Sequence, residues 1–393
     1  MNNERWLLPE GIDEVLPPRA WVLENLRRDL LDLFRSWGYE LVIPPFIEYL
    51  ESLLTGAGSD LDLKTFKLTD QMTGRLMGVR ADMTPQAARM DAHQLRRDVP
   101  TRLCYLGTVL HTRTDDLFGS RDPLQIGAEL FGHSGVESDV EVLCLMMETL
   151  KRTGIEDVYL DLGHVGIFRG LARQAELDAM GEQALFDTLQ RKAIPEIKTL
   201  LHELGVSEPL AGMLVALAGL NGDDAIERAK GLLAQANPDV HEALNYLDQV
   251  AQEVRQRLPN VPLHFDLGEL RCYHYQTGVV FAAFVPGRGQ EIARGGRYDA
   301  TGKVFGRARP ATGFSADLKT LLQLGAQVSQ LNKDEGIFAP WSNDPALQQE
   351  IANLRAQGKR VICALPGQRG DAAGMGCGKM LKQQDGVWII SSI

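Results

Sequence analysis

The sequence has few cysteines, and their spacing excludes the sites that cysteines usually build. The five cysteines among 393 residues are odd in number, widely scattered and without a Cys-x-x-Cys pair. A disulfide framework or a zinc site needs a regular set of closely spaced cysteines. We therefore expect reduced thiols, no bound metal ion and no disulfide bonds.

Excess positive charge and long apolar runs are also lacking. Acidic residues outnumber basic ones by 52 to 41, which gives a formal net charge of -11. A field of that sign disfavours nucleic acid as a partner. No stretch is apolar over the length that a bilayer requires, and the first residues, MNNERWLLPEG, include no apolar signal segment. We expect a cytoplasmic protein that binds neither nucleic acid nor a membrane.

The chain contains enough hydrophobic residues to form two or three packed units, because they make up 44% of the sequence. A long amphipathic helix is predicted over residues 21–37, with one face formed by Val22, Leu26, Leu30, Leu33 and Phe34. A strand over residues 39–45 follows and is ended by two prolines. Two further strands and a helix are expected at residues 66–70, 76–80 and 84–96.

The residue pattern changes twice in the second half of the chain. Residues 168–257 are rich in Leu, Ala, Gln and Glu at helical spacing, which predicts a helical insertion in a sheet-based domain. Strand patterns return at residues 264–267 and 279–285. We divide the chain into a domain of residues 1–325 and a small C-terminal α/β domain of residues 326–393. In the small domain we expect strands and a helix at residues 336–340, 345–357, 361–365 and 387–390, and a glycine-rich loop at residues 367–379.

Two stretches, residues 105–132 and 293–321, carry most of the functional information. The first contains Gln125 and Glu129, the second contains GGRYD, and RCYHYQTG begins between them at Arg271. These segments resemble motif 2, the GGRYD segment with motif 3, and the histidine-specific motif of histidyl-tRNA synthetases. The resemblance covers about residues 5–325 and implies an α+β fold. That fold is the class II aminoacyl-tRNA synthetase-like antiparallel sheet flanked by helices.

The resemblance also implies a pocket for an amino acid. An α-ammonium group needs buried acceptors, and an imidazole ring needs a donor and an acceptor matched to its two nitrogens. Taken singly, each candidate residue could be an ordinary core or turn residue. Taken together, in the order of the family, they predict histidine-binding residues at Asp82, Thr84, Gln125, Glu129, Arg271, Tyr275 and Tyr298.

The residues that would activate an amino acid with ATP are replaced. Negative charge that accumulates on the α-phosphate in this reaction is met by fixed cations, usually arginines. In class II synthetases one such arginine belongs to motif 2 and another to motif 3. Here His111 and Thr320 stand at those positions, and Arg113 replaces an acidic neighbour. We therefore expect no catalytic residues and no cofactor.

Three segments, LPEGIDEVLPP, YHYQTGVVFAA and RGGRYD, resemble a non-catalytic family, the regulatory subunits of ATP phosphoribosyltransferase. That resemblance implies a partner, the short-form catalytic subunit of this enzyme. It also implies a homodimer core within a hetero-oligomer, which in the family is a hetero-octamer. Histidine would be the effector that inhibits this first step of histidine biosynthesis.

Two other functions fit part of the sequence. An amino-acid adenylating ligase, or an aminoacyl transferase acting on a non-tRNA acceptor, would show amino-acid-dependent pyrophosphate exchange with ATP. A free-standing amino-acid sensor would purify without a catalytic partner. Solvated helix faces, rather than a phosphate-binding surface, are our interpretation of the basic residues Arg75, Arg80, Arg89, Arg96, Arg97 and Arg102.

Overall fold

Strands from distant parts of the chain assemble into one nine-stranded sheet in the order β1-β5-β6-β12-β11-β10-β7-β9-β8. Neighbours from β5 through β7 in this order pair antiparallel, whereas β1 joins β5 and β9 joins β7 in parallel. The predicted α+β fold with an antiparallel sheet is confirmed. The strands are β1 (Glu40–Leu41), β5 (Thr101–Thr108), β6 (Leu124–Phe131), β7 (Tyr159–His164), β8 (Asn221–Gly222), β9 (Leu263–Asp266), β10 (Val279–Phe284), β11 (Ala293–Arg297) and β12 (Ala311–Asp317).

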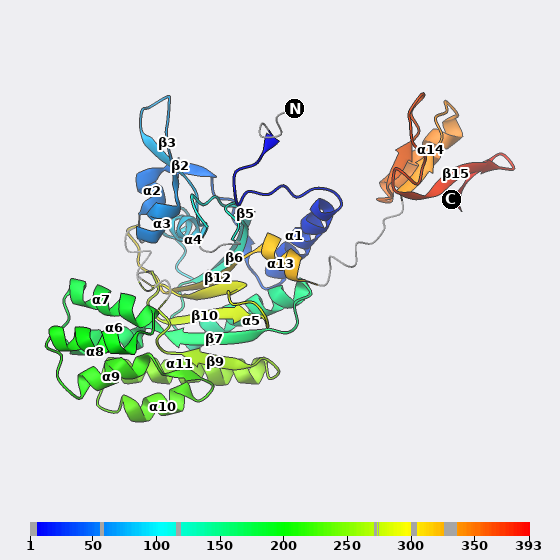
Figure 1. The fold of residues 1–393 in the computed structure, drawn as a ribbon. Helices are drawn as coiled ribbons and strands as arrows, with labels where there is room; N and C mark the ends of the chain where they lie inside the picture. Colours follow the sequence, from blue (N-terminus) through cyan, green and yellow to red (C-terminus); the bar gives the residue numbers. More distant parts are fainter. Residues whose placement is uncertain are drawn as a thin grey trace. The chain divides into compact units, whose positions relative to one another are not determined.

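The computed structural model describes residues 6–55, 59–114, 119–270, 273, 275–299, 305–325 and 336–393. The chain divides into two compact units, Met1–Val328 and Ser329–Ile393 (Figure 1). The nine-stranded sheet belongs to the first unit, and each unit has buried apolar clusters of its own.

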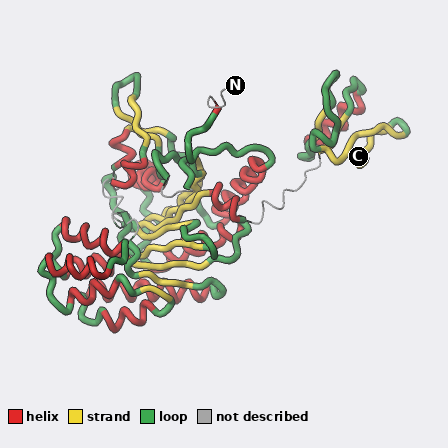
Figure 2. Tube along the Cα trace, viewed as in Figure 1, coloured by secondary structure: helices red, strands yellow, loops and turns green. Residues whose placement is uncertain are grey.

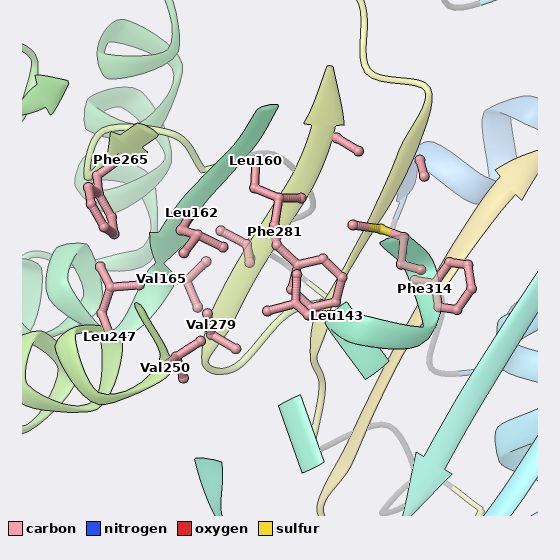
Figure 3. Packing of buried hydrophobic residues seen from close by; sticks show 14 of the residues in the cluster. Leu143, Leu160, Leu162, Val165, Leu247, Val250, Phe265, Val279, Phe281 and Phe314 are labelled. Carbon is pink, nitrogen blue, oxygen red and sulfur yellow. The ribbon is translucent and has the colours of Figure 1, made fainter. Parts of the chain in front are cut away.

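Helices α1 (Arg19–Ser36), α5 (Val136–Arg152) and α13 (Leu318–Leu324) cover one face of the sheet. The predicted helix over residues 21–37 is confirmed as α1, and its buried face is formed by Leu23, Leu26, Leu30, Leu33 and Phe34. Figure 3 shows Leu143 of α5 beside Phe281 of β10, within the main apolar cluster. Apolar side chains at a period of two on the strands and of about 3.6 on the helices produce this core.

The helical segment lies between β7 and β9, and Figure 2 shows its helices gathered on that side of the sheet. The helical segment begins at His164. Its ring Nδ1 accepts a hydrogen bond from the Gly166 backbone N–H at 3.1 Å and so caps the first helix. The last helix, α11, contacts β7, α5 and α6. The helices are α6 (Val165–Gln174), α7 (Ala179–Gln190), α8 (Ile194–Glu203), α9 (Leu210–Leu217), α10 (Ala225–Leu232) and α11 (Pro238–Arg257).

A second, three-stranded sheet has the order β2-β4-β3. The two strands predicted at residues 66–70 and 76–80 are confirmed as β3 and β4, whereas the strand predicted at residues 39–45 is reduced to β1. Prolines at the end of that stretch have no N–H to donate to a ladder, which limits its pairing. The elements are β2 (Ile47–Tyr49), β3 (Phe66–Thr69), β4 (Leu76–Val79), α2 (Leu50–Leu54) and α3 (Ser59–Lys64).

The helix predicted at residues 84–96 has two parts. Helix α4 (Thr84–Arg89) is α-helical and continues as a π-helix, η2 (Met90–Leu95). Asp91, in the π-helical part, forms a buried ion pair with Arg309. Arg96 ends the segment in the left-handed conformation, with φ at 47°. The sequence pattern over residues 84–96 gives no signal for this change.

The second unit contains a four-stranded sheet in the order β14-β13-β15-β16. Its hairpin turns at Asp385 and Gly386, which both have positive φ. The predicted end of the glycine-rich loop at residue 379 is wrong, because β15 begins at Cys377. Only Cys377 and Leu381 of β15 are buried, so the strand has little apolar alternation. The elements are β13 (Gly336–Ala339), α14 (Pro345–Ala356), β14 (Val361–Cys363), β15 (Cys377–Gln384) and β16 (Val387–Ser392).

Candidate functional site

The candidate pocket lies on the sheet face opposite α5, over strands β5, β6, β12 and β11. Residues directly opposite one another on antiparallel strands point to the same face of a sheet. Glu129 pairs with Gly313, and Gly313 pairs with Gly296. Gln125 is four residues from Glu129 and shares its face, whereas Ala128 points into the core beneath α5. One row across three strands therefore holds an acid and two glycines.

Glu129 is the buried acid of this face, with 1% of its surface exposed. Its Oε1 accepts a hydrogen bond from the Tyr105 hydroxyl at 2.8 Å, and its Oε2 accepts one from the Tyr298 hydroxyl. Burial raises the pKa of Glu129 to about 8, and the two tyrosine hydroxyls offset only part of that desolvation. Burial therefore favours the neutral form of the Glu129 carboxyl.

A second group of polar side chains lies at the start of α4. The Gln125 side-chain amide donates to Oδ1 of Asp82 at 2.7 Å and accepts from the Met83 backbone N–H at 2.9 Å. The Thr84 backbone N–H donates to the same Asp82 oxygen at 2.9 Å. The Thr84 and Tyr105 hydroxyls lie 2.8 Å apart. Since Tyr105 also donates to Glu129, a continuous network joins Asp82 to Glu129.

Aromatic rings border the network. The rings of Tyr275 and Tyr298 have centroids 4.9 Å apart and planes tilted by 30°. Arg271 lies outside the described residues. The structure thus brings together six of the sequence-predicted site residues, namely Asp82, Thr84, Gln125, Glu129, Tyr275 and Tyr298.

Tyr273, two residues before Tyr275, fastens this segment to the helical region. Its hydroxyl donates to Glu182 of α7, and its backbone oxygen accepts from Nη2 of Arg169 of α6 at 2.6 Å. The Arg169 guanidinium carbon also lies 4.5 Å from the centre of the Tyr273 ring. Phe168 packs against the same ring edge-on, at a centroid distance of 5.2 Å. Contacts from two helices therefore hold the segment that borders the pocket.

Two glycines lie directly beneath polar side chains of the site. A Cβ on Gly313 would lie 1.6 Å from Oε2 of Glu129, so the acid leans over the neighbouring strand. A Cβ on Gly296 would lie 2.8 Å from Oε1 of Gln276. Any side chain at these two positions would displace a polar group of the pocket.

Tyr105 is the main site residue that sequence reasoning missed. The sequence identified it only as a landmark of motif 2, although its hydroxyl joins the Thr84 and Glu129 parts of the network. A signal existed, because Tyr105 and Gly107 alternate on one strand with the same period as Gln125 and Glu129. The requirement for Gly313 left no such signal, because it depends on how far Glu129 leans across the sheet.

Arg297 of the GGRYD segment has a structural position rather than a place in the network. Its guanidinium forms an ion pair with Asp139 at 3.0 Å and is 6% exposed. It also donates to the backbone oxygens of His133 and Gly135 and to the Ser138 hydroxyl. These contacts attach β11 to the start of α5, which supports the pocket from the opposite face.

The positions of the synthetase cations are occupied by groups that bind the protein itself. His111 donates from Nε2 to the Ala81 backbone oxygen at 2.8 Å, since a carbonyl can only accept. The Thr320 hydroxyl donates to Asp317 at 2.7 Å and helps to cap α13. Arg113 is exposed. None of these three described residues places a buried cation over the pocket.

Two other cations near these motifs are also engaged. Arg121 donates to the backbone oxygens of His111 and Glu10, both at 3.1 Å. Lys319 forms an ion pair with Asp122 at 2.7 Å and donates to the Asp13 backbone oxygen at 3.3 Å. Both side chains fix the N-terminal segment, and a shift toward a phosphate would break these bonds.

The interpretation of the six basic residues as solvated helix faces is wrong for most of them, because only Arg89 lies within a helix, and two of the others are buried or paired within the fold. Arg80 is 7% exposed and donates to the backbone oxygens of Pro44 and Thr108. Arg102 lies on β5 and forms a bidentate pair with Glu141 at 2.7 Å. These arginines connect the sheet to its surroundings.

Neither a metal cluster nor a membrane span is found in the part of the chain that the structure describes. Over residues 6–55, 59–114, 119–270, 273, 275–299, 305–325 and 336–393, no three His, Cys, Asp or Glu residues are arranged to hold a metal ion. No helix within those ranges is long and apolar enough to cross a membrane. Cys104, Cys144, Cys363 and Cys377 are free thiols.

Comparison with known families matches both units of the chain. The family described as histidyl-tRNA synthetase matches residues 11–321. The family described as ATP phosphoribosyltransferase subunit HisZ C-terminal domain matches residues 334–391. The synthetase-like part therefore carries a C-terminal domain that is specific to another family.

Relatives and solved structures agree with this division. A regulatory subunit of ATP phosphoribosyltransferase from Thioalkalivibrio sulfidiphilus is 59% identical over 394 residues, covering 100% of both chains. One from Pseudomonas aeruginosa is 57% identical and covers 99% of this chain and 98% of its own. A crystal structure from Bacillus halodurans, named as an ATP phosphoribosyltransferase regulatory subunit/histidyl-tRNA synthetase, is 28% identical with a TM-score of 0.82 and covers 94% of this chain and 95% of that chain.

A histidyl-tRNA synthetase from Nostoc has a TM-score of 0.76 at 18% identity and covers 98% of this chain and 97% of that chain, which shows the likeness of fold alone. The fold is thus that of a class II synthetase, whereas identity along the full length joins the chain to one group of proteins with that fold. The chain belongs to the family of ATP phosphoribosyltransferase regulatory subunits.

Proposed function

We propose that this chain is the non-catalytic regulatory subunit of a short-form ATP phosphoribosyltransferase. It activates the catalytic subunit in the first step of histidine biosynthesis and makes that step sensitive to histidine. Two copies of the chain form a homodimer core within a hetero-oligomer, which in the family is a hetero-octamer. We place this assembly in the cytoplasm.

The observation that carries this proposal is a contrast between two parts of one site. The polar network from Asp82 to Glu129 is continuous and largely buried. The positions of the ATP-binding arginines hold His111 and Thr320, which bind nearby protein groups instead. A site that keeps its acceptors but has a histidine and a threonine in place of the two ATP-binding arginines favours binding an amino acid over activating it.

The network has the chemistry that an amino acid requires. The oxygens of Asp82 and Gln125 and the Thr84 hydroxyl offer acceptors for an ammonium group. Glu129 lies between two tyrosine hydroxyls, so it is oriented before a ligand arrives. A cation bound beside it would favour the ionised carboxylate and lower its raised pKa. We propose that histidine occupies this site and that Arg271, which lies outside the described residues, is among the residues that bind it.

Regulation then requires a difference between two conformations. The chain activates its partner by binding one conformation of the catalytic subunit more tightly than the other. Histidine inhibits by favouring the opposite conformation, and the two effects are linked by one coupling free energy. The reaction of ATP with phosphoribosyl pyrophosphate takes place on the partner.

Reconstitution tests the proposal. Purified chain is added to the short-form catalytic subunit from the same source, and phosphoribosyl-ATP formation is followed with and without histidine. We expect stimulation, a complex on a sizing column and new inhibition by histidine. Glu129→Gln should weaken that inhibition at least tenfold, whereas Glu253→Gln, at an exposed pair on α11, should leave it unchanged. Absence of both stimulation and complex would refute the proposal.

The alternative function, an adenylating ligase or an aminoacyl transferase, is tested by a separate assay. Such an enzyme would exchange pyrophosphate with ATP in the presence of its amino acid. We expect no exchange, because His111 and Thr320, at the positions of the two ATP-binding arginines, bind nearby protein groups. Purification of the chain from its source alone, without the catalytic subunit, would instead favour a free-standing sensor.

A further inference from the structure

Strand β16 of the second unit has one free edge. Among the strands that the structure describes, it lies at the end of the order β14-β13-β15-β16 and pairs only with β15. Its apolar side chains are exposed, with Val387 at 61%, Ile389 at 38% and Ile390 at 44%. Proteins usually protect an exposed apolar edge with charged side chains or proline. Residues 386–393 contain neither, so this edge is open to pairing.

The two faces of β16 differ in what covers them. Nε1 of Trp388 donates to Asp344, the N-cap residue of α14, at 2.7 Å, so Trp388 is on the face that α14 covers. Side chains alternate along a strand, so Ile390 shares the face of Trp388, whereas Val387 and Ile389 are on the other face. Exposed apolar side chains therefore border the free edge on both faces of the sheet.

The hydrogen bonds to β15 determine which backbone groups of β16 point to the free edge. The Ile393 N–H donates to the Gly378 backbone oxygen at 3.1 Å, in continuation of the β15–β16 pairing. In an antiparallel pair, every second residue directs both its N–H and its C=O toward the neighbouring strand. Ile393 therefore belongs to the series that faces β15. The alternate series points outward to the free edge, and its members are Trp388, Ile390 and Ser392.

A second copy of the same strand fits this edge. When two copies are related by a two-fold axis centred on Ile390, that residue lies opposite itself, and Trp388 lies opposite Ser392 of the second copy. The outward N–H and C=O groups of these residues then satisfy one another in hydrogen-bonded pairs. Because the strand carries no charge, self-pairing brings no like charges opposite each other, which would be destabilising.

The faces and the turn select this register. A two-fold axis perpendicular to the sheet leaves each side chain on its own face, so the axis must pass through a residue rather than between two. Centring on Ile389 would place Ser392 opposite Gly386, which lies in the hairpin turn with φ at 78°. Centring on Ile390 keeps the pairing within the extended segment. It places Val387 opposite Ile393 and Ile389 opposite Ser391 on the face away from α14.

We infer that the free edge of β16 is a docking surface for a second copy of this chain, with which it forms an antiparallel pair centred on Ile390. The sheets of the two second units then continue into one sheet across both copies. The contact is closed, because each copy uses the same edge and leaves no β16 edge for a third. It depends neither on histidine nor on the catalytic subunit.

Cross-linking of the full chain tests both the contact and its register. Ile389 and Ser391 of the two copies would form a non-hydrogen-bonded pair with Cα atoms about 4.5 Å apart, which is within the range of a disulfide. The double variant Ile389→Cys/Ser391→Cys should therefore form a covalent dimer on mild oxidation, visible on a non-reducing gel. Ile389→Cys alone and Ser391→Cys alone are the controls. Neither residue lies opposite itself in this register, so both should stay at the wild-type background.

Further substitutions in the double-cysteine variant test the pairing itself. Ile390→Lys brings two lysines opposite each other and should lower the rate of cross-linking at least tenfold. Gln383→Lys adds the same charge at an exposed position of β15, away from the free edge, and should leave the rate within twofold. Ser392→Pro removes an outward N–H but no hydrogen bond to β15, so it should also slow cross-linking without unfolding the unit.

Several results would overturn the inference. One is the absence of a covalent dimer from the double variant when its circular dichroism matches the wild type. Another is equal cross-linking by Ile389→Cys alone, which would show a different register. A ladder of larger species would indicate non-specific aggregation through the edge. Loss of the covalent dimer when the catalytic subunit is present before oxidation would assign the edge to that subunit. None of these results bears on stimulation or histidine inhibition in the reconstituted enzyme, so the proposed function is judged separately.

Discussion

The Tyr105 hydroxyl lies 2.8 Å from Oε1 of Glu129, although the two residues are not directly opposite each other on their strands. Tyr105 is paired with Gly127, over which its ring leans. A Cβ on Gly127 would lie 2.5 Å from that hydroxyl. The donor that orients the buried acid thus depends on a glycine on the same strand as the acid.

The raised pKa of Glu129 predicts how stability depends on pH. Burial holds the folded-state pKa near 8, above its ordinary value of 4.5, so the folded chain keeps a proton that the unfolded chain loses. The free energy of unfolding should therefore fall between about pH 4.5 and pH 8 because of this group, by on the order of a few kcal/mol. Glu129→Gln carries no titrating group at that position.

Urea unfolding at pH 5 and pH 8 measures this effect. The stability of Glu129→Gln relative to the wild type should rise between the two pH values. A difference that is the same at both would mean that Glu129 does not titrate in this window.

Histidine binding should release protons. A cation beside Glu129 favours the carboxylate, so its pKa should fall from about 8 toward its ordinary value when the ligand binds. Calorimetry at pH 7 in two buffers with different ionisation enthalpies should show release of close to one proton from this group. The release should disappear in Glu129→Gln, and its persistence there would assign the proton to another group.

A methyl group at Gly313, beneath Glu129, should disrupt the site. In Gly313→Ala the new Cβ would meet Oε2 of Glu129 at 1.6 Å and the Ala128 backbone oxygen at 2.8 Å. We expect a loss of stability of about 1–3 kcal/mol and loss of histidine sensitivity. Gly231→Ala is the control, because this helical glycine has no atom within 4 Å of its Cβ position. It should raise stability by about 0.5–1 kcal/mol, as measured by urea unfolding.

The buried ion pair in the π-helical segment should be important for stability. Nη1 of Arg309 donates to both oxygens of Asp91, at 2.7 and 3.0 Å, and both side chains are less than one-tenth exposed. Arg309→Met would leave Asp91 buried without its cation, which should cost about 3–5 kcal/mol. Arg307→Ala, which removes an exposed pair with Asp98, should cost less than about 1 kcal/mol. Equal losses in thermal or urea unfolding would contradict the structure.

Sequence patterns predicted those elements that local periodicity determines. Helix α1 and strand β10 have strong apolar repeats, and both were predicted within a few residues. Strand β15 was missed because most of its side chains are exposed. The ion pair of Asp91 with Arg309 and the reach of Tyr105 over Gly127 join residues that are distant in sequence. Family motifs identified the acid and amide of the pocket, but not the geometry that joins them.

The attachment of Tyr273 to α6 and α7 has a thermodynamic consequence. Tyr275, beside Tyr298, is only two residues away, so the pocket wall and the anchored ring belong to one short segment. In the proposed histidine complex, a ligand that restricts Tyr275 would also restrict Tyr273, and the helices would become harder to separate from that ring. Because such coupling is reciprocal, a change that loosens these helices would weaken binding of the ligand by the same free energy. The helical region is therefore a place from which affinity on the sheet can be tuned without touching the ligand.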